Sequence, residues 1–360
     1  MRAKKLIVLI LLAGFVLGLA AAQSFAAPAA QKDKDKKEVS PPAKIYIPKE
    51  VKAVMLDGLK TRQARLDIPF NIFKTTLLPA QQALYIVFFL KMKNADLGFA
   101  PAPVAASQVA EAAAAAAAQP KLKAGFNVYL QFHKVENGTP TQIVKEVYVP
   151  ASIEADSAGF DPEKEEWYTV GYPLLPGTYL LAIALTSQDL KKIGLQYYDF
   201  SLPDPKSFTK ELETTPIFLL KELKNTQVVE NRTELHKGLF VYSVAQITPN
   251  IDNVIAVGDP LDVFYVIFGA QPNEQNKYKI EVSYEVKKGE EAAIRFEPAI
   301  YEAPLVSHAL PMKQTLIHKQ GDKETRETRD LEAGNYTLNL EITDKISGNT
   351  CTKKFDFTIK

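Results

Sequence analysis

The clearest structural pattern in this 360-residue chain is LLPGTYLLAIALTSQD at Leu174–Asp189, which returns as LEAGNYTLNLEITDKI at Leu331–Ile346. In each copy a leucine precedes a short turn that ends in glycine, and a tyrosine follows two residues after that glycine. From the tyrosine onward, apolar residues occupy every second position, which places them on one face of a β-strand. Both stretches therefore predict a strand with one buried face.

Two strands upstream of this pattern also occur twice, in the same order. The alternating apolar run that starts at Phe126 has a counterpart that starts at Tyr278. The apolar run at Ala83–Leu90 has a counterpart at Pro260–Gly269. Three strands that recur in one order predict a duplicated module.

Strands, and not long helices, are predicted along most of the chain. The candidate strands of the first copy are Leu66–Phe73, Leu84–Met92, Phe126–Lys134, Ile143–Val149, Tyr168–Tyr172, Tyr179–Leu185 and Gln196–Leu202. Short strands separated by turn sequences are typical of a β-sandwich. We therefore expect an all-β protein with two tandem immunoglobulin- or fibronectin-III-like β-sandwich modules, at residues 62–203 and 234–360.

Two segments interrupt this pattern. A proline-punctuated linker is expected at residues 204–233, although its apolar stretch Ile217–Leu223 should pack against one module. The first module also contains an Ala/Pro-rich insertion at 95–123, where the second copy has only a short connection. The insertion is either a mobile arm or a low-complexity loop that the surface tolerates.

The N-terminus predicts export. Arg2, Lys4 and Lys5 precede the apolar run Leu6–Ala20, and small residues follow it, with cleavage expected after Ala22 or Ala26. An uncleaved anchor is the alternative, but the run is short for a membrane span. Residues 1–26 are therefore a predicted signal peptide. Residues 27–61 are a predicted disordered tail with a short helical or extended lead-in. The expected location is periplasmic or secreted, with no membrane span after cleavage.

Composition excludes some partners and crosslinks. Lys and Arg number 43 against 42 Asp and Glu, a net charge of +1. This balance provides no general attraction to nucleic acid. Cys351 is the only cysteine, so the modules have no internal disulfide and must be stable through their cores alone.

No catalytic pattern stands out, so we expect a protein that is not an enzyme and has no metal or cofactor. The four histidines form none of the usual zinc motifs, and His133 is expected on a solvent-facing side of its strand. A sandwich-fold hydrolase is an alternative. The acidic run DPEKEEW at Asp161–Trp167 could supply carboxylates, but that chemistry needs two of them facing one cleft.

Aromatic residues provide a second alternative, carbohydrate or cell-wall binding. Trp167, Tyr168 and Tyr172 cluster near one strand, and Tyr197 and Tyr198 form a second pair. In each adjacent pair, alternation directs one ring inward and the other outward. An exposed ring stacks well on the apolar face of a sugar. These five residues are the candidate ligand-binding residues.

The sequence also resembles a known kind of module. RLDIPFNIF (Arg65–Phe73), LYIVFFL, GFNVYLQFHKVENG and LLPGTYLLAIALTSQD resemble the β-sandwich accessory modules of secreted bacterial von Willebrand type A-related and GWxTD-containing proteins. The type A metal motif and GWxTD itself are absent. The resemblance implies extracytoplasmic interaction or scaffolding. Because sheet edges can accept another strand, the leading hypothesis is a non-enzymatic scaffold that binds another envelope or extracellular protein.

Overall fold

The computed structural model describes residues 47–80, 83–102, 121–204, 211–226, 232–320 and 323–360. Tyr46–Lys360 forms one compact unit. The described residues lie mostly in antiparallel strands, with one α-helix, α2 (Lys49–Asp57), and one short 3-10 helix, η1 (Asn94–Leu97). The expectation of an all-β protein is confirmed. The predicted signal peptide and most of the predicted insertion lie outside the described residues.

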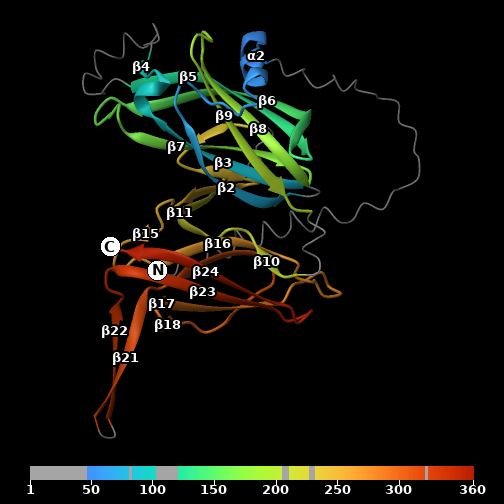
Figure 1. The fold of residues 1–360 in the computed structure, drawn as a ribbon. Helices are drawn as coiled ribbons and strands as arrows, with labels where there is room; N and C mark the ends of the chain where they lie inside the picture. Colours follow the sequence, from blue (N-terminus) through green and yellow to red (C-terminus); the bar gives the residue numbers. More distant parts are fainter. Residues whose placement is uncertain (1–46, 81–82, 103–120, 205–210, 227–231, 321–322) are drawn as a thin grey trace, which may run out of the picture. The chain divides into compact units, whose positions relative to one another are not determined.

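A first pair of sheets faces each other across one core (Figure 1). The larger sheet has the order β1-β9-β8-β5-β4, with β6 beside β5. Its strands are β1 (Arg65–Leu66), β4 (Ala100–Pro101), β5 (Lys121–Glu136), β6 (Thr139–Asp156), β8 (Gly177–Ser187) and β9 (Ile193–Leu202). The smaller sheet has the order β12-β7-β3-β2, with β2 (Asn71–Ala80), β3 (Ala83–Lys93), β7 (Glu165–Leu174) and β12 (Leu235–Lys237).

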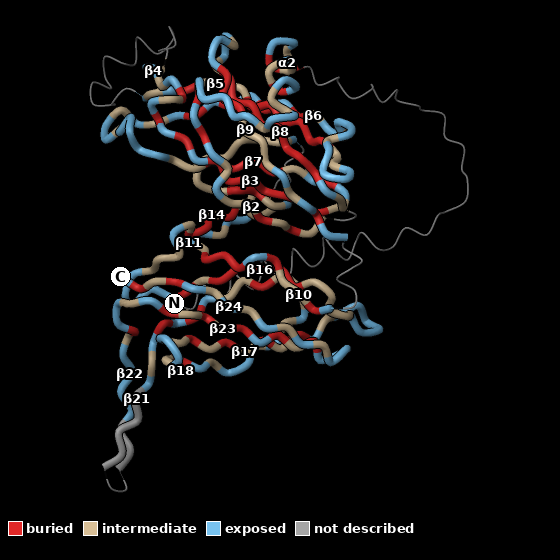
Figure 2. Tube along the Cα trace, in the orientation of Figure 1, coloured by how far each residue is buried: buried red, intermediate tan, exposed pale blue. Residues whose placement is uncertain are grey.

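Alternation along the strands builds the first core. Every second side chain of β5 and β8 points between the two sheets, and these residues are buried: Phe126, Val128, Leu130, Phe132, Tyr179, Leu181, Ile183 and Leu185. The facing strand β3 contributes Leu84, Ile86, Phe88 and Leu90 to the same cluster. Figure 2 shows buried stretches along these strands, and part of each strand is buried on both faces. The predicted inward faces of β5 and β8 are therefore confirmed, but β8 also buries its other face, at Leu180, Ala182 and Ala184, where one buried face was predicted.

A second pair of sheets surrounds a separate core. One sheet has the order β10-β16-β11-β14-β13, with β20 beside β16. It comprises β10 (Glu213–Thr214), β11 (Phe218–Asn225), β13 (Phe240–Tyr242), β14 (Ala245–Pro249), β16 (Leu261–Phe268) and β20 (Leu305–Leu310). The other has the order β15-β24-β23-β17-β18, with β19 beside β17. It comprises β15 (Val254–Ile255), β17 (Ile280–Lys288), β18 (Glu291–Arg295), β19 (Ala299–Tyr301), β23 (Gly334–Asp344) and β24 (Thr350–Ile359).

The second core follows the same rule as the first. Ile280, Val282, Tyr284 and Val286 of β17 are buried at alternate positions, as are the inward residues of β23. A two-stranded hairpin, β21 (Lys313–Gln320) and β22 (Lys323–Asp330), forms its own sheet and extends away from this pair (Figure 1). The free thiol of Cys351 lies on β24 and is half-buried.

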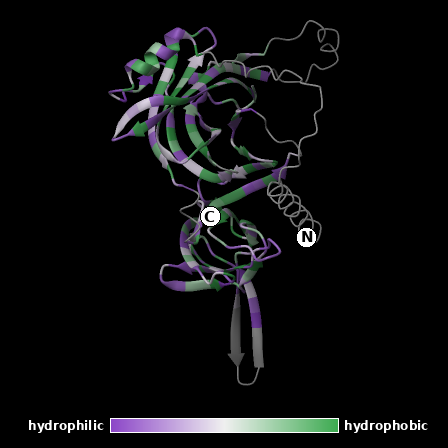
Figure 3. Cartoon of the chain, turned by 90° about the vertical axis from the view of Figure 1, so that its right-hand side faces the viewer, coloured by the Kyte–Doolittle hydropathy of each residue, from purple (hydrophilic) through white to green (hydrophobic). Residues whose placement is uncertain are grey.

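Helix α2 covers part of the outer face of the first large sheet. Val51 and Met55 on one side of the helix are buried against Tyr129 of β5 and Ala182 of β8. The helix carries both hydrophobic and hydrophilic residues, as an amphipathic element should (Figure 3). On its polar side, Lys52 Nζ lies 3.1 Å from Glu146 Oε1. The lead-in, for which the sequence left a helical and an extended conformation open, contains this helix.

Two expectations need correction. The strand predicted at Leu66–Phe73 is interrupted, since β1 ends at Leu66 and β2 begins at Asn71; Pro69, which has no N–H to donate, lies between them. His133 was expected in solvent, but its exposed fraction is only 3%. The outer face of its sheet is itself partly covered, by α2, so alternation alone does not place a side chain in water.

The segment expected as a linker contributes strands. Residues 213–225 contain β10 and β11, which pair with β16, and Phe218 and Leu219 are buried. Beyond the expected linker, β12 joins the first small sheet by pairing with β7. The segment predicted to be a linker between two modules therefore also contributes strands to their sheets. No helix among the described residues is long and apolar enough to cross a bilayer.

A further apolar cluster joins residues of the two pairs of sheets. We call it the joining cluster; its buried members are Leu78, Val87, Phe89, Phe218, Phe240, Ile247, Phe264 and Val266. Phe89 of β3 has an exposed fraction of 0%, and its ring centroid lies 6.1 Å from that of Phe240. Burial of this many aromatic and aliphatic side chains couples the stability of the two pairs.

Substitution of Phe89 tests the joining cluster. Phe89→Ala should lower the free energy of unfolding by about 3–5 kcal/mol, because a fully buried ring is replaced by a cavity. Phe73→Ala is the matched control, since Phe73 contacts Phe89 but is 37% exposed, and it should cost about 1 kcal/mol. Urea unfolding followed by the fluorescence of Trp167, the single tryptophan, measures both. Equal costs for the two variants would contradict this assignment.

Candidate functional site

A groove of about 680 Å³ lies on the outer face of the sheet β18-β17-β23-β24. Its side chains come from alternate positions of three neighbouring strands: Ser283, Glu285 and Lys287 of β17, Thr337, Asn339 and Glu341 of β23, and Thr352, Lys354 and Asp356 of β24. The same strands bury their other residues in the second core. Alternation therefore produces a polar outer row on each strand, and three rows in register form the groove.

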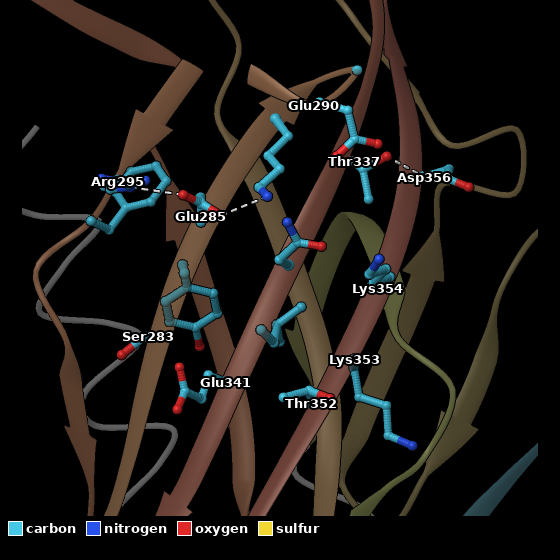
Figure 4. A pocket seen from close by; sticks show the side chains of 16 residues that line it. Ser283, Glu285, Glu290, Arg295, Thr337, Glu341, Thr352, Lys353, Lys354 and Asp356 are labelled. Atoms are coloured by element: carbon cyan, nitrogen blue, oxygen red, sulfur yellow. Dashed lines mark hydrogen bonds and ion pairs between the residues drawn. The ribbon is translucent and has the colours of Figure 1, made fainter. Parts of the chain in front are cut away.

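One end of the groove is internally neutralised. Arg295 Nε lies 2.7 Å from Glu285 Oε1, and Lys287 Nζ lies 3.5 Å from Glu285 Oε2 (Figure 4). The hydrogen bond from Arg295 lowers the pKa of the Glu285 carboxyl, so the group is a carboxylate at neutral pH. Thr337 Oγ1 donates to Asp356 Oδ1 at 2.6 Å across the β23–β24 pair. Interactions within the protein therefore already use much of the hydrogen-bonding capacity of these side chains.

The centre of the groove differs from this end. Glu341 of β23 and Lys354 of β24 are exposed and make no ion pair with a described residue. Asn339 pairs with Lys354 across the two strands, and its Oδ1 is out of contact with solvent and accepts no hydrogen bond from the described part of the chain. An unsatisfied amide oxygen in such a position costs free energy. The groove thus offers an exposed negative group and an exposed positive group to whatever binds there.

A smaller hollow of about 300 Å³ lies at the other side of β24. It is lined by Thr214, Thr215, Pro216, Ile217, Lys353, Lys354 and Phe355. Lys353 forms an ion pair with Glu213, which leaves Pro216, Ile217 and Phe355 as the apolar part of this lining. Strand β24 therefore separates a polar groove from a more apolar hollow.

A partly buried polar network lies behind the groove. The hydroxyl of Tyr284 on β17 lies 2.8 Å from that of Tyr265 on β16 and 2.9 Å from that of Tyr301 on β19. Tyr301 Oη in turn lies 2.8 Å from His308 Nδ1 on β20, and the imidazole stacks on Tyr284. Burial raises the pKa of all three tyrosines, so their hydroxyls stay protonated. The network links the two sheets of the second pair by side-chain hydrogen bonds.

The five aromatic residues predicted to bind a ligand do not come together. Tyr168, Tyr172 and Tyr198 belong to the first core, where Tyr172 stacks on Phe132 and Tyr198 packs against Phe88. Trp167 packs on the joining cluster, with its ring 5.9 Å from that of Phe89.

Tyr197 is the fifth of these residues, and it packs beneath α2. Its hydroxyl donates to the Met55 carbonyl, and burial raises its pKa to about 12. Alternation within each adjacent pair is as predicted, but the outward ring is covered by another element. All five aromatic side chains are buried or half-buried. The rings are thus divided among three clusters and form no common platform for a sugar.

Glutamates of the acidic run at Asp161–Trp167 likewise already have partners, which are lysines of the same chain. Glu163 pairs with Lys93 at 3.0 Å, Glu165 with Lys91 at 2.8 Å, and Glu166 with Lys164 at 2.8 Å. The hydrogen bond from Lys91 lowers the pKa of Glu165. A general acid in glycoside hydrolysis needs a raised carboxyl pKa, so this pairing works against the hydrolase alternative.

Comparison with known proteins adds no assignment. No protein-family model matches the chain, and no curated protein matches it. The resemblance to accessory modules of secreted bacterial proteins stays a prediction. The groove residues were not among the predicted site residues, because the sequence argument used the apolar half of each alternating strand. The polar half, which recurs in β17, β23 and β24, was the pattern that could have located them.

One buried histidine, His133, and one half-buried histidine, His308, predict a pH dependence of stability. Burial lowers the pKa of His308, and it lowers that of His133 despite the opposing charge of Glu146. The unfolded chain therefore takes up these protons near pH 6.5 while the folded chain does not. The stabilisation that these two neutral histidines give the folded state is fully present above about pH 6.5, and it is lost as the pH falls below that value.

Urea unfolding between about pH 7 and pH 5 measures this effect. The free energy of unfolding should fall with decreasing pH, and the slope should decrease in His308→Gln and in His133→Gln, each of which removes one titrating group. His236→Gln, on the half-buried strand β12, is the control for histidine replacement. An unchanged slope in both His308→Gln and His133→Gln would contradict the prediction.

Proposed function

We propose that the chain is an exported, non-enzymatic scaffold that binds another envelope or extracellular protein. We further propose that it is built from two tandem β-sandwich modules of the immunoglobulin or fibronectin-III type. The observation that carries the binding proposal is the polar groove on β17, β23 and β24, where the exposed side chains of Glu341 and Lys354 make no ion pair with a described residue.

The strand order supports tandem modules. In the first large sheet β9, β8 and β5 are consecutive neighbours, followed by β6. In the second pair β24, β23 and β17 are consecutive neighbours, followed by β18 and β19. The facing sheets place β3 beside β7 and β16 beside β20. This correspondence agrees with the sequence repeat and with one module used twice.

The character of the groove supports binding of a protein. It is open, its walls are strands, and its lining mixes both charges with hydroxyl and amide groups. Polar groups of both signs on a broad surface suit the rim of a protein interface. The ion-paired state of Glu285 argues against a general-acid role there. The predicted signal peptide is the basis for proposing a periplasmic or secreted location.

Site-specific photo-crosslinking in the native cells tests this function. Benzoylphenylalanine placed at Glu290, on the rim of the groove, should yield a stoichiometric crosslink to another protein in the envelope fraction. The same probe at Glu154, an exposed residue of β6, should not. Glu341→Lys should lower the yield at Glu290 about tenfold by reversing a charge at the interface, whereas Glu154→Lys should leave it unchanged. Repeated recovery of the protein alone would overturn the proposal.

A further inference from the structure

Strand β24 has a free edge. On one side it pairs with β23 along its whole length, and on the other β15 covers only Thr358 and Ile359. No strand among the described residues pairs with the remaining stretch, Thr350–Asp356, on that side. Its backbone groups on that side are therefore available to a strand from another polypeptide.

The direction of these groups follows from the pairing at the end of the strand. Thr358 donates its N–H to Asn253 and so points toward β15, away from β23. The β23–β24 register contains no bulge, so the direction alternates regularly toward the start of the strand. The N–H and C=O groups of Thr352, Lys354 and Asp356 accordingly point out of the free edge.

The two hollows flank this edge. Thr352, Lys354 and Asp356 direct their exposed side chains to the groove, while Phe355 lines the smaller hollow with Pro216 and Ile217. An added strand sends successive side chains to opposite faces of the sheet. A residue opposite Lys354 would therefore lie in the groove, and its two neighbours would point toward the smaller hollow.

These surroundings define the kind of segment that fits. Lys354 has no acidic partner among the described residues, so an Asp or Glu opposite it would form a cross-strand ion pair. Apolar side chains on either side of that acid would contact Phe355, Ile217 and Pro216. The fitting segment is extended, with one acidic residue between two apolar ones.

A second copy of β24 fits less well than such a segment. In an antiparallel register centred on Lys353, this lysine lies opposite Lys353 of the second copy, and a register centred on Lys354 does the same with Lys354. Both registers place two positive charges opposite each other, which is unfavourable. A register centred on Phe355 would direct the second strand into the position of β15. A register centred on Thr352 leaves Phe355 without a partner. Lysines at a sheet edge commonly prevent such self-pairing.

We propose that the protein binds an extended acidic segment of a different protein by strand addition to Thr352–Asp356 of β24. The inference rests on the protein-binding function proposed above and specifies its mode. Backbone hydrogen bonds to the edge supply affinity, and the groove and the smaller hollow supply specificity for alternate side chains.

The test uses the full chain in its native cells, with benzoylphenylalanine at Glu290 and four variants. Thr352→Pro removes the outward N–H, whereas Thr352→Val keeps it and is the matched control. Lys354→Glu reverses the charge opposite the proposed acid, and Lys60→Glu makes the same change at an exposed lysine of the first half. Thermal melting verifies that each variant is folded.

We expect Thr352→Pro and Lys354→Glu each to lower the crosslink yield at least about tenfold, and both controls to stay within about twofold of the parent chain. The crosslinked peptide, identified by mass spectrometry, should carry an acidic residue between apolar ones. If Thr352→Pro does not fold, Lys354→Glu and its control carry the test.

The remaining outcomes separate the two proposals. An undiminished crosslink in Thr352→Pro and Lys354→Glu would overturn strand addition and leave the protein-binding function standing. A crosslink to a second copy of the chain would overturn the proposed partner. Absence of any crosslink in the parent chain would overturn both proposals together.

Discussion

Burial of every second side chain between facing sheets is the interaction on which the whole structure depends. With a single cysteine, Cys351, the chain has no internal disulfide to compensate for a weak core. Stability must come from the apolar rows of strands such as β5, β8, β17 and β23, at about 25 cal/mol for each Å² of apolar surface removed from water. The Tyr265–Tyr284–Tyr301–His308 network adds side-chain hydrogen bonds between the sheets of the second pair.

The same alternation determines where function can arise. A strand that commits one face to the core has its other face free for different uses, and the two pairs of sheets use that freedom differently. In the first pair, α2 covers outward residues of β5, β8 and β9. In the second pair, the outward residues of β17, β23 and β24 line an open groove. The free edge of β24 adjoins this groove, so a polar surface and unpaired backbone groups occur side by side.

Local periodicity was sufficient to predict the elements that bury one face. The strands around Phe126, Tyr179 and Tyr336 were found because each needs an apolar residue at alternate positions. A single residue, Pro69, accounts for the divided strand near Leu66. The expected linker became strands because its apolar residues pair with β16, a contact that its own sequence does not specify.

Burial by elements that are distant in sequence explains why the predicted aromatic residues form no exposed binding site. Sequence alternation correctly directs Trp167 and Tyr197 away from the first core, but it does not show that the joining cluster and α2 cover them. His133 is buried as well, on a face that alternation alone would assign to water. The groove depends on the register of three strands that are separate in sequence, so Glu341 and Lys354 become neighbours only in the folded chain.

Amide hydrogen exchange along β24, followed residue by residue by NMR on the folded protein, tests most directly whether regular alternating strands leave this edge open. The account predicts slow exchange at Cys351, Lys353 and Phe355, whose N–H groups point to β23, and fast exchange at Thr352, Lys354 and Asp356, whose N–H groups point outward. Uniformly fast exchange would show that β24 does not pair as described. Uniformly slow exchange would show that the edge is already covered, and either result would contradict the account.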